Sequence, residues 1–544
     1  MPQLKIMGFD GIVPRESPTM LGDSQAQTAL NVKLYSRELR AWRGSTEEYT
    51  PLISNVKTIY KYYTNHDPIW LTWNTDVNVV PNPASDSLLA WRLYYTGDGA
   101  PKKTNYTMAT TGTGAYPRSY MPMGVIAPAA APTATVVGSG TTNAETRSYV
   151  FTYVTVFPGI NEESAPSPAS TAVTTYTGDS VTINGFESVP SGYGILYRRI
   201  YRTVTGASVD TYNLVAEIPI GTTTYSDTLT ASQLGEVIPS IGWNEPPTDL
   251  SGLIALPGGA LAGFSGNTVY FSEPYFPHAW PLSYALNVSY PIVGLGVYGT
   301  SIAVLTDRYP FIISGYTPGQ MSVERVPILE PCVSKRSITS DETGVVYASP
   351  NGLVNIGPAS RGVVSHPLFR RDEWQSALPS DIQGAATDGR YFAFYTTYYS
   401  THKTMVMSRD DSPALSTLDL QATAVHIDSK TGNLYYVDPV DNHIRQADAD
   451  NSTLVTYNWK SKRFMLPGAT SFSALKLDAD FTVSPGTATV KIYGEGTLVS
   501  TTTVSSLDPV RIAPFKYRWY EIEVDAKIPV RSVAIATTVA ELHQ

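Results

Sequence analysis

ATDGRYFAFY, residues 386–395, decides the fold: a glycine turn stands between two apolar strands. The aromatic residues after Gly389 suit a strand, and the Asp-Gly pair suits a tight turn. The pattern recurs in ALPGGALAGF (255–264), LGVYGTSIAVL (295–305), SDETGVVYAS (340–349) and DSKTGNLYYV (428–437). Counted from Gly258, successive turn glycines are 41, 45, 45 and 43 residues apart. This spacing is typical of β-propeller blades.

Five repeats between residues 250 and 467 would leave a propeller incomplete. Residues 52–100 show the same succession of strands and turns and can supply a further blade. Because a small sheet cannot bury both of its faces alone, blades stack around an axis. The sequence therefore predicts an all-β protein whose main body is a β-propeller of about six blades, split by an insertion.

The insertion begins after the Pro/Ala-rich linker GVIAPAAAPTATVVGSG, residues 124–140. Residues 130–246 contain about seven strand-like runs with turns every eight to twelve residues, which resembles a fibronectin type III β-sandwich. The expected core of this module is Tyr149, Phe151, Tyr153, Leu196, Tyr201 and Tyr225. The predicted domains are an N-terminal arm with the first blade or blades (1–125), the inserted sandwich (130–246), the remaining blades (250–467) and a small C-terminal β-sandwich (468–544).

Composition agrees with a strand-rich chain. Of the 544 residues, 42% are hydrophobic and only 16% are charged, against about 25% charged in ordinary soluble domains. The 41 glycines and 40 prolines would interrupt long helices. We therefore expect very little helix, and a length that requires more than one core.

Charge and cysteine content argue against several functions. The net charge is −9 and the isoelectric point is about 5.4, so no sequence-wide basic field is available for tight binding of nucleic acid. A single cysteine, Cys332, excludes an intrachain disulfide, and no Cys/His spacing indicates a zinc site. With no signal-peptide pattern and no apolar run of about eighteen residues, we expect neither export by that route nor membrane insertion.

Candidate catalytic motifs are weak. GLGVYG, residues 294–299, matches a dinucleotide fingerprint but precedes a strand-like run instead of a helix. Ser265 misses the spacing of a nucleophile elbow and suits a turn. Glu162 and Glu163 would point to opposite faces of a strand. The Arg/Tyr cluster at 197–202 suits cross-strand packing better than binding of nucleic acid. We therefore predict no catalytic, cofactor-binding or metal-binding residues, and no enzyme.

The opening of the chain resembles a family of phage virion proteins, the tail tubular B or nozzle proteins of short-tailed bacteriophages. The segments that carry the resemblance are MGFDGIVPR (7–15), ALNVKLYSRELR (29–40), WLTWNTDV (70–77) and YYTGDG (94–99). The resemblance implies a virion protein assembled in the host cytoplasm. It also implies a homo-oligomer, most simply a hexamer, that forms a tube below the head-to-tail adaptor proteins. Such a tube holds tail fibre or spike proteins and conducts genomic DNA, as a transient passenger, during ejection.

The N-terminal arm is the expected contact for a neighbouring subunit or adaptor, since Arg and aromatic residues concentrate at interface hot spots. The alternative is that the arm completes a blade of its own propeller. Two other functions stay open: a receptor- or carbohydrate-binding tail protein, and a propeller glycosidase with carboxylates from different blades. The expected contact residues are Phe9, Arg15, Tyr35, Arg37, Arg40 and Trp42.

Overall fold

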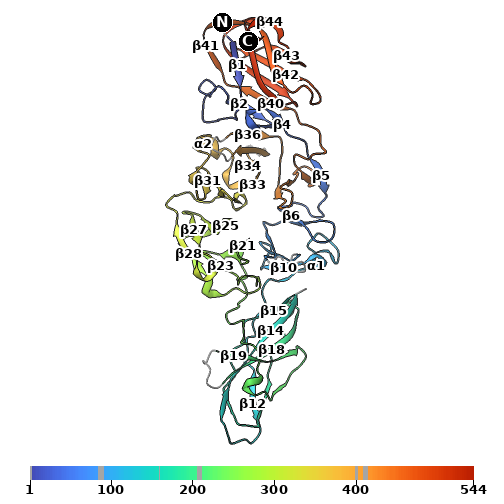
Figure 1. Cartoon of the computed structure of the whole chain (residues 1–544), viewed down its shortest axis with the longest axis vertical. Coiled ribbons are helices and arrows are strands. Elements are labelled where there is room, and N and C mark those ends of the chain that lie inside the picture. Colours follow the sequence, from blue (N-terminus) through green and yellow to red (C-terminus); the bar gives the residue numbers. More distant parts are fainter. Residues whose placement is uncertain are drawn as a thin grey trace. The chain divides into compact units, whose positions relative to one another are not determined.

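The structure is a computed structural model that describes residues 3–83, 91–157, 160–204, 211–397, 402–408 and 414–543. It is nearly all-β, with 47% of residues in strands and 6% in helices, so the expected all-β class is confirmed (Figure 1). The described helices are short: α1 (Tyr106–Thr110), α2 (Arg371–Gln375) and the 3-10 turns η1 (Tyr35–Arg37), η2 (Ala231–Gln233), η3 (Leu282–Tyr284), η4 (Pro318–Gln320), η5 (Lys335–Ser337), η6 (Pro379–Asp381) and η7 (Val539–His543).

The chain divides into two compact units. Unit 1 comprises residues 1–61, 307–310 and 326–544, and unit 2 comprises residues 62–306 and 311–325. Unit 2 contains three four-stranded antiparallel sheets. Unit 1 contains two such sheets, and between them in the chain four antiparallel strands of residues 383–418 that form one end of a 12-stranded sheet. Each unit also carries additional strands with a core of their own.

The three four-stranded sheets of unit 2 lie before and after the predicted insertion. The first strand of the second sheet, β21, contacts β8 of the sheet before it and β25 of the sheet after it. Val80, Tyr94 and Met123 therefore share a core with Leu253 and Trp280 across the insertion. The strands are β7 (Ile69–Trp73), which precedes the sheets, then β8 (Asn78–Pro81), β9 (Leu93–Thr96), β10 (Lys102–Thr104), β11 (Met121–Pro122); β21 (Ser251–Ala255), β22 (Leu261–Ser265), β23 (Thr268–Phe271), β24 (Leu286–Asn287); β25 (Ile292–Tyr298), β26 (Ser301–Thr306), β27 (Phe311–Ser314) and β28 (Ser322–Arg325).

Unit 1 repeats this arrangement. Its middle set of four strands begins with β33, which contacts β29 of one neighbouring sheet and β37 of the other. N-terminal strand β5 completes the last sheet by pairing with β39. The strands are β29 (Thr339–Asp341), β30 (Gly344–Ser349), β31 (Gly352–Ile356), β32 (Arg361–Val363); β33 (Gln383–Thr387), β34 (Arg390–Thr396), β35 (His402–Ser408), β36 (Leu415–Leu418); β37 (Ala424–Ile427), β38 (Leu434–Val437), β39 (Ile444–Gln446) and β5 (Thr46–Tyr49).

The repeated glycine turns join the first strand of a sheet to the second. Gly299 stands between β25 and β26 at φ 53°, and Gly389 between β33 and β34 at φ 69°. Both values lie in the left-handed region, which glycine enters without the penalty that a Cβ atom brings. The glycine hairpins that the sequence predicts are therefore confirmed at these positions.

The inserted module, residues 130–246, places the sheet β15-β14-β18-β19 opposite the sheet β12-β17-β20. Tyr149, Phe151 and Tyr153 are buried in the core that these sheets share. Tyr225 is only partly buried. The strands are β12 (Thr133–Val137), β13 (Glu145–Arg147), β14 (Tyr149–Phe157), β15 (Ile160–Glu163), β16 (Val173–Thr175), β17 (Ser180–Asn184), β18 (Ile195–Thr203), β19 (Tyr212–Pro219) and β20 (Tyr225–Asp227).

Two expected core residues of the module lie elsewhere. Leu196 is 49% exposed, so its core assignment is wrong. A register shift between β14 and β18 pairs Thr155 with Ile195, and Ile195 is the side chain that enters the core. Tyr201 is buried, but in a small separate cluster with Val150 and Ile238.

Strands from both ends of the chain join β33–β36 in one 12-stranded sheet of unit 1. In Figure 1 the two termini lie beside each other, and β1 pairs with β45 over five residues, from Gln3 with Ala536 to Met7 with Ser532. Strand β2 pairs with β40 and also, through Leu30, with β36. The strands of this sheet not yet named are β1 (Gln3–Met7), β2 (Ala26–Leu30), β40 (Tyr457–Ser461), β41 (Phe464–Ala479), β42 (Ala488–Gly494), β43 (Thr497–Val504), β44 (Val510–Ala526) and β45 (Val530–Ala536). Two separate two-stranded sheets pair β3 (Val32–Lys33) with β4 (Arg40–Ala41) and β6 (Thr58–Tyr62) with β7.

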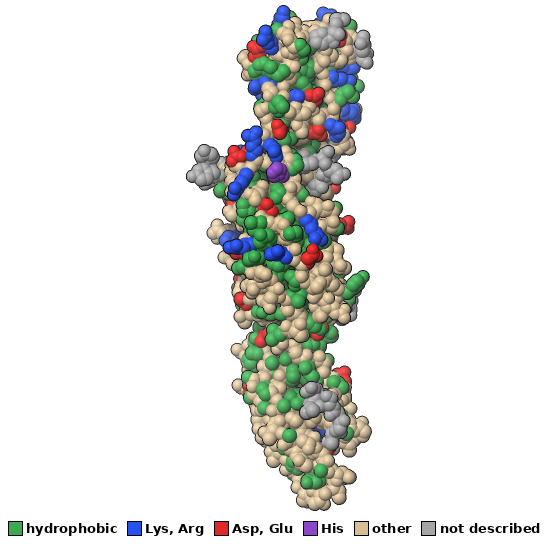
Figure 2. Space-filling model, turned by 90° about the vertical axis from the view of Figure 1, so that its left-hand side faces the viewer, with side chains coloured by type: hydrophobic (Ala, Val, Ile, Leu, Met, Phe, Trp, Pro, Cys, Tyr) green, Lys and Arg blue, Asp and Glu red, His purple; other side chains and the backbone are tan. Residues whose placement is uncertain are grey.

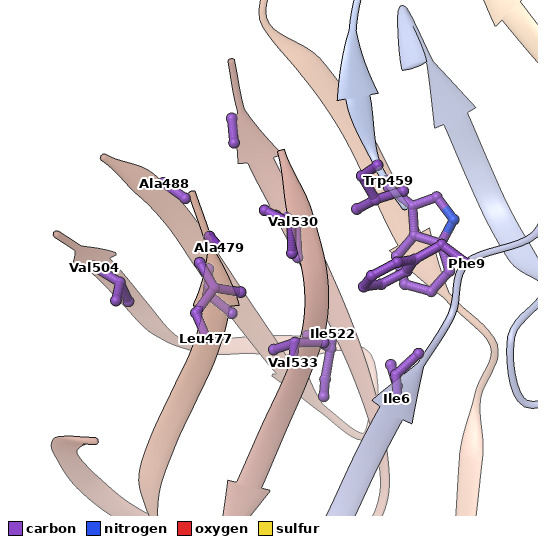
Figure 3. Close-up of a cluster of buried hydrophobic side chains, with 14 of the residues drawn as sticks. Ile6, Phe9, Trp459, Leu477, Ala479, Ala488, Val504, Ile522, Val530 and Val533 are labelled. Atoms are coloured by element: carbon purple, nitrogen blue, oxygen red, sulfur yellow. The ribbon is translucent and has the colours of Figure 1, made fainter. Parts of the chain in front are cut away.

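This pairing changes the predicted boundary at residue 468. Strand β41 runs without a break from Phe464 to Ala479, across the expected start of the C-terminal domain. The core of the C-terminal strands includes Ile6 and Phe9 from the other end of the chain, together with Trp459, Leu477 and Val533 (Figure 3). The C-terminal module therefore requires the N-terminal arm for its own core.

Candidate functional site

A cavity of about 670 Å³ lies in unit 1 beside the N-terminal arm. Arm residues Lys33, Arg37 and Trp42 line it on one side, and Leu368 and Arg390 line it on the other. A second cavity of about 300 Å³ shares Trp42 and Arg390 with the first. We call the two together the arm groove. It contains three of the contact residues that the sequence predicts, Phe9, Arg37 and Trp42.

Trp42 is the central aromatic side chain of the arm groove. The Lys33 ammonium lies 4.5 Å from the centroid of the indole ring, within the range of a cation–π contact. Phe392 meets the ring edge to face at 5.9 Å. The indole Nε1 is buried and has no hydrogen-bond acceptor among the described residues. A buried donor without an acceptor costs free energy.

The turn that carries Arg37 has an uncommon backbone. Ser36 and Arg37 have φ values of 52° and 60° although neither is a glycine. The Arg37 guanidinium lies 3.2 Å from the Asp10 carboxylate and 3.2 Å from the Ser24 hydroxyl, to which it donates. Two successive residues in the left-handed region cost conformational energy, and such strain is concentrated at functional sites. The turn holds the Arg37 side chain against Asp10 and leaves it 65% exposed at the groove.

Phe9 has a structural role that the sequence does not predict. It is 1% exposed, and its ring meets Trp459 edge to face at 4.8 Å. The Trp459 indole N–H in turn donates to the backbone carbonyl of Asp10 at 3.0 Å. Phe9 therefore belongs to the core of its own chain, and its role as a contact residue stays a prediction.

The other predicted contact residues lie around the groove but do not line it. Arg15 donates to the backbone carbonyl of His366 at 3.0 Å. Arg40 pairs with Glu38 at 2.9 Å. Tyr35 begins η1, and its side chain lies outside the part that the structure describes.

Sequence reasoning missed the side of the groove that the middle set of strands in unit 1 provides. Arg390 follows the turn glycine of β33 and β34 and forms an ion pair with Asp388 at 3.1 Å. Leu368 precedes α2 and accepts a hydrogen bond from the Arg15 backbone through its carbonyl. Both residues are more than 300 positions from the arm, and no local pattern links them to it.

A second cluster of charges is buried at the base of the inserted module. Lys103 on β10 forms an ion pair with Glu162 on β15, and both side chains are 1% exposed. Arg92 and Lys103 both lie over the Phe157 ring, with centroid distances of 4.9 and 5.2 Å. This cluster joins the module to the sheet β11-β10-β9-β8 through buried, paired charge.

His278 lies in the same cluster and stays neutral there. Its side chain is buried, and burial together with Lys103 and Arg92 outweighs Glu162, so that the pKa falls from 6.5 to about 4. The imidazole Nε2 has no hydrogen-bond partner among the described residues. Protonation at this position would add a third positive charge beside one carboxylate.

Glu163, next in sequence, has separate partners. It accepts hydrogen bonds from Thr152 and Tyr201 at 2.8 Å each, and pairs with Arg199 at 2.7 Å. The neighbouring acids therefore serve different contacts, as the strand periodicity predicts. Arg202 pairs with Asp227 at 3.0 Å, with both side chains fully buried. The Arg/Tyr cluster at 197–202 thus holds neighbouring strands together.

The remaining motifs also have structural surroundings. Gly294–Gly299 lies largely within β25, and strand β26 follows it, as expected for a chance match. Ser265 ends β22 and donates to Asp249 at 2.6 Å. Within the described residues, no group of three or more His, Cys, Asp or Glu side chains is placed to hold a metal ion. In the same part of the chain, no helix has the length and apolar character needed to cross a membrane.

Comparison with known proteins gives only weak likenesses. No protein-family model matches the chain, and no curated protein matches it. Among solved structures, exo-beta-1,3-galactanase from Phanerochaete chrysosporium with galactose is 8% identical, covers 54% of this chain and 98% of its own, and has a TM-score of 0.22. A eukaryotic initiation factor is 10% identical over 85% of this chain and 98% of its own, with a TM-score of 0.27. PorZ, a surface component of the type-IX secretion system of Porphyromonas gingivalis, is 11% identical over 87% of this chain and 69% of its own, with a TM-score of 0.27. Likenesses at this level carry no argument about activity.

Proposed function

We propose that this chain is a structural subunit of a phage tail, of the nozzle type. In this proposal it forms a ring with further copies, most simply six, that conducts DNA and serves as a platform for other tail proteins. The resemblance of the first hundred residues suggested this role. The observation that carries it is the use of buried charge: Lys103–Glu162, Arg199–Glu163 and Arg202–Asp227 all fasten strands to one another.

The proposed role requires that the sheets of the subunit form a rigid body. In each unit, three antiparallel sets of four strands contact one another through their first strands, which is how consecutive propeller blades pack. We propose that these sets of strands are blades of a β-propeller of about six blades, with a fibronectin type III-like module inserted and a small C-terminal β-sandwich that also includes strands from the start of the chain. Sheets packed in this way leave few exposed strand edges and resist local unfolding.

The distribution of charge is compatible with a conduit. Unit 2 contains 9 Lys and Arg against 17 Asp and Glu, whereas unit 1 contains 29 against 30. On the face drawn in Figure 2, Lys and Arg are frequent over unit 1 and sparse over the inserted module. An acidic or neutral wall makes few phosphate contacts, so DNA that passes it gains little affinity.

We further propose that the arm groove binds a neighbouring subunit or a head-to-tail adaptor. Trp42 lines the groove with an aromatic side chain, and Arg37 offers an exposed cation. Trp and Arg are the residues that most often dominate interface energies, with losses of about 2 kcal/mol or more on truncation. That loss corresponds to roughly 30-fold weaker binding.

The test is to measure adaptor binding by the full chain and by groove variants. Trp42→Ala and Arg37→Ala should each weaken the complex by at least about tenfold, while Arg40→Ala should change it little because Arg40 does not line the groove. Arg37 is exposed, so its variant separates loss of contact from loss of folding. Equal affinity of all three variants and the parent would rule out the groove as the contact.

A further inference from the structure

Three arginine side chains gather beside the arm groove without a carboxylate partner. Arg15 lies in the loop between β1 and β2, and Arg370 and Arg371 lie at the start of α2. Arg370 and Arg371 are exposed, and Arg15 is partly exposed. Within the described residues, no carboxylate oxygen lies within 4.0 Å of any of the three guanidinium groups. We call these three residues the arginine cluster.

Backbone carbonyls, not acids, hold the cluster together. The Arg15 guanidinium lies 3.0 Å from the carbonyl oxygen of His366, to which it donates, and 3.3 Å from Nδ1 of the same residue. The Arg370 guanidinium donates to the carbonyl of Arg15 at 2.9 Å. In the described part of the chain, the Arg371 side chain makes no hydrogen bond. Because a guanidinium carries several N–H donors in a fixed fork, most donors of the cluster are open to a ligand.

A cluster of this kind selects an oxyanion. Guanidinium groups bind carboxylates and phosphates through paired hydrogen bonds, a geometry that the ammonium group of lysine lacks. Positive charges near one another repel, and an anion between them offsets that repulsion. The ligand group is therefore a carboxylate or a phosphate.

Nearby acids favour the carboxylates of a short protein segment over the phosphates of DNA. Glu16 follows Arg15, and Asp372 and Glu373 follow Arg371. Glu16 and Asp372 are exposed. A DNA duplex carries a long row of phosphates, which would also meet these acids, and a site that neutralises few phosphates provides little affinity. A short acidic segment avoids this repulsion because it ends within the cluster.

The cluster adjoins the arm groove. The backbone N–H of Arg15 donates to the carbonyl of Leu368 at 3.0 Å. Leu368 and Pro367 both line the groove. The cluster therefore borders the surface that the proposed function gives to a neighbouring subunit or adaptor, and one partner can contact both.

We infer that the protein that occupies the arm groove carries a short acidic segment, and that Arg15, Arg370 and Arg371 bind its carboxylates. This inference rests on the docking role of the arm groove in the proposed function and names the chemistry of the partner. Exposed ion pairs contribute little singly, so the three charges act together. Their main effects are on partner selectivity and on a salt-dependent association rate.

The direct test measures binding of a fluorescent hexaglutamate peptide to the full-length chain at low salt, by fluorescence anisotropy. Hexaglutamine is the uncharged control peptide and should not bind. Arg371→Gln should weaken hexaglutamate binding about threefold, and the double variant Arg370→Gln, Arg371→Gln about tenfold. The matched control is Arg511→Gln, at an exposed position on β44 of the same unit, which should change binding by less than about twofold.

Two results with the peptide would overturn the inference: no binding by the parent, or equal binding by the parent and the double variant. A short DNA duplex is the competing probe. If the duplex binds more tightly than the peptide and loses affinity in the double variant, the cluster is a nucleic-acid site and the inference is wrong.

The adaptor complex separates this inference from the proposed function. The double arginine variant should weaken that complex and reduce its dependence on salt. If Trp42→Ala and Arg37→Ala weaken the complex while the double arginine variant does not, only the inference fails. If none of these variants weakens it, docking at the arm groove fails as well.

Discussion

Removal of the Glu162 carboxylate should destabilise the contact between β10 and β15, where the inserted module joins the sheet before it. Glu162→Gln leaves the buried Lys103 ammonium without its carboxylate, because Glu163 is engaged by other partners. Loss of one partner of a buried ion pair typically costs about 3–5 kcal/mol. The double variant Lys103→Met, Glu162→Leu should fall within about 1 kcal/mol of the parent or above it in stability.

Hydrogen exchange on the full chain measures this cost where it occurs. Peptides that cover β10 and β15 should exchange about 10² to 10³ times faster in Glu162→Gln, since 1.4 kcal/mol is a factor of ten. Lys102→Met is the matched control on the same strand, because Lys102 pairs at 2.7 Å with the more exposed Asp98. That variant should accelerate exchange by less than about tenfold. If Glu162→Gln exchanges within about threefold of the parent, the buried pair does not fasten the module and the reasoning fails.

Three further outcomes follow. Phe9→Ala should destabilise the C-terminal core by about 3–5 kcal/mol, which hydrogen exchange would detect as faster exchange in β40 and β45. Arg37→Ala should cost under about 1 kcal/mol. Equal effects of the two variants would contradict the core role of Phe9. The folded-state pKa of His278 is lowered to about 4, so the unfolded chain binds its proton first, and stability should fall as the pH drops from about 6.5 towards 4, by up to about 3 kcal/mol in total. His278→Leu should flatten this dependence, and an unchanged dependence would exclude His278 as its source. Duplex DNA at low salt should bind the assembled protein weakly, and a nanomolar dissociation constant would contradict an acidic or neutral conduit.

Local patterns in the sequence were sufficient for the repeated sheets. The turns at Gly299 and Gly389 and the strands around them depend on residues within about ten positions of each other, so their spacing predicts the hairpins. The pairing of Arg199 with Glu163 also follows from strand periodicity once the strands are known.

Contacts between distant segments could not be predicted in the same way. Alternation in β1 shows that one face is buried, but it does not show that β45, more than 500 residues away, is the partner. Phe9 was expected at an interface because no local pattern links it to Trp459, the side chain that covers it, which lies near the other end of the chain. Leu196 was misplaced because the bulge between β14 and β18 shifts the alternation by one residue. The groove residues Leu368 and Arg390 have no local signature at all.

Imaging of the purified full-length chain by negative stain, with its mass measured by native mass spectrometry, bears most directly on the proposed role. We expect rings with a central channel and a mass that corresponds to six copies, either alone or after addition of the adaptor. Particles that stay single copies under both conditions would contradict a ring-forming tail component.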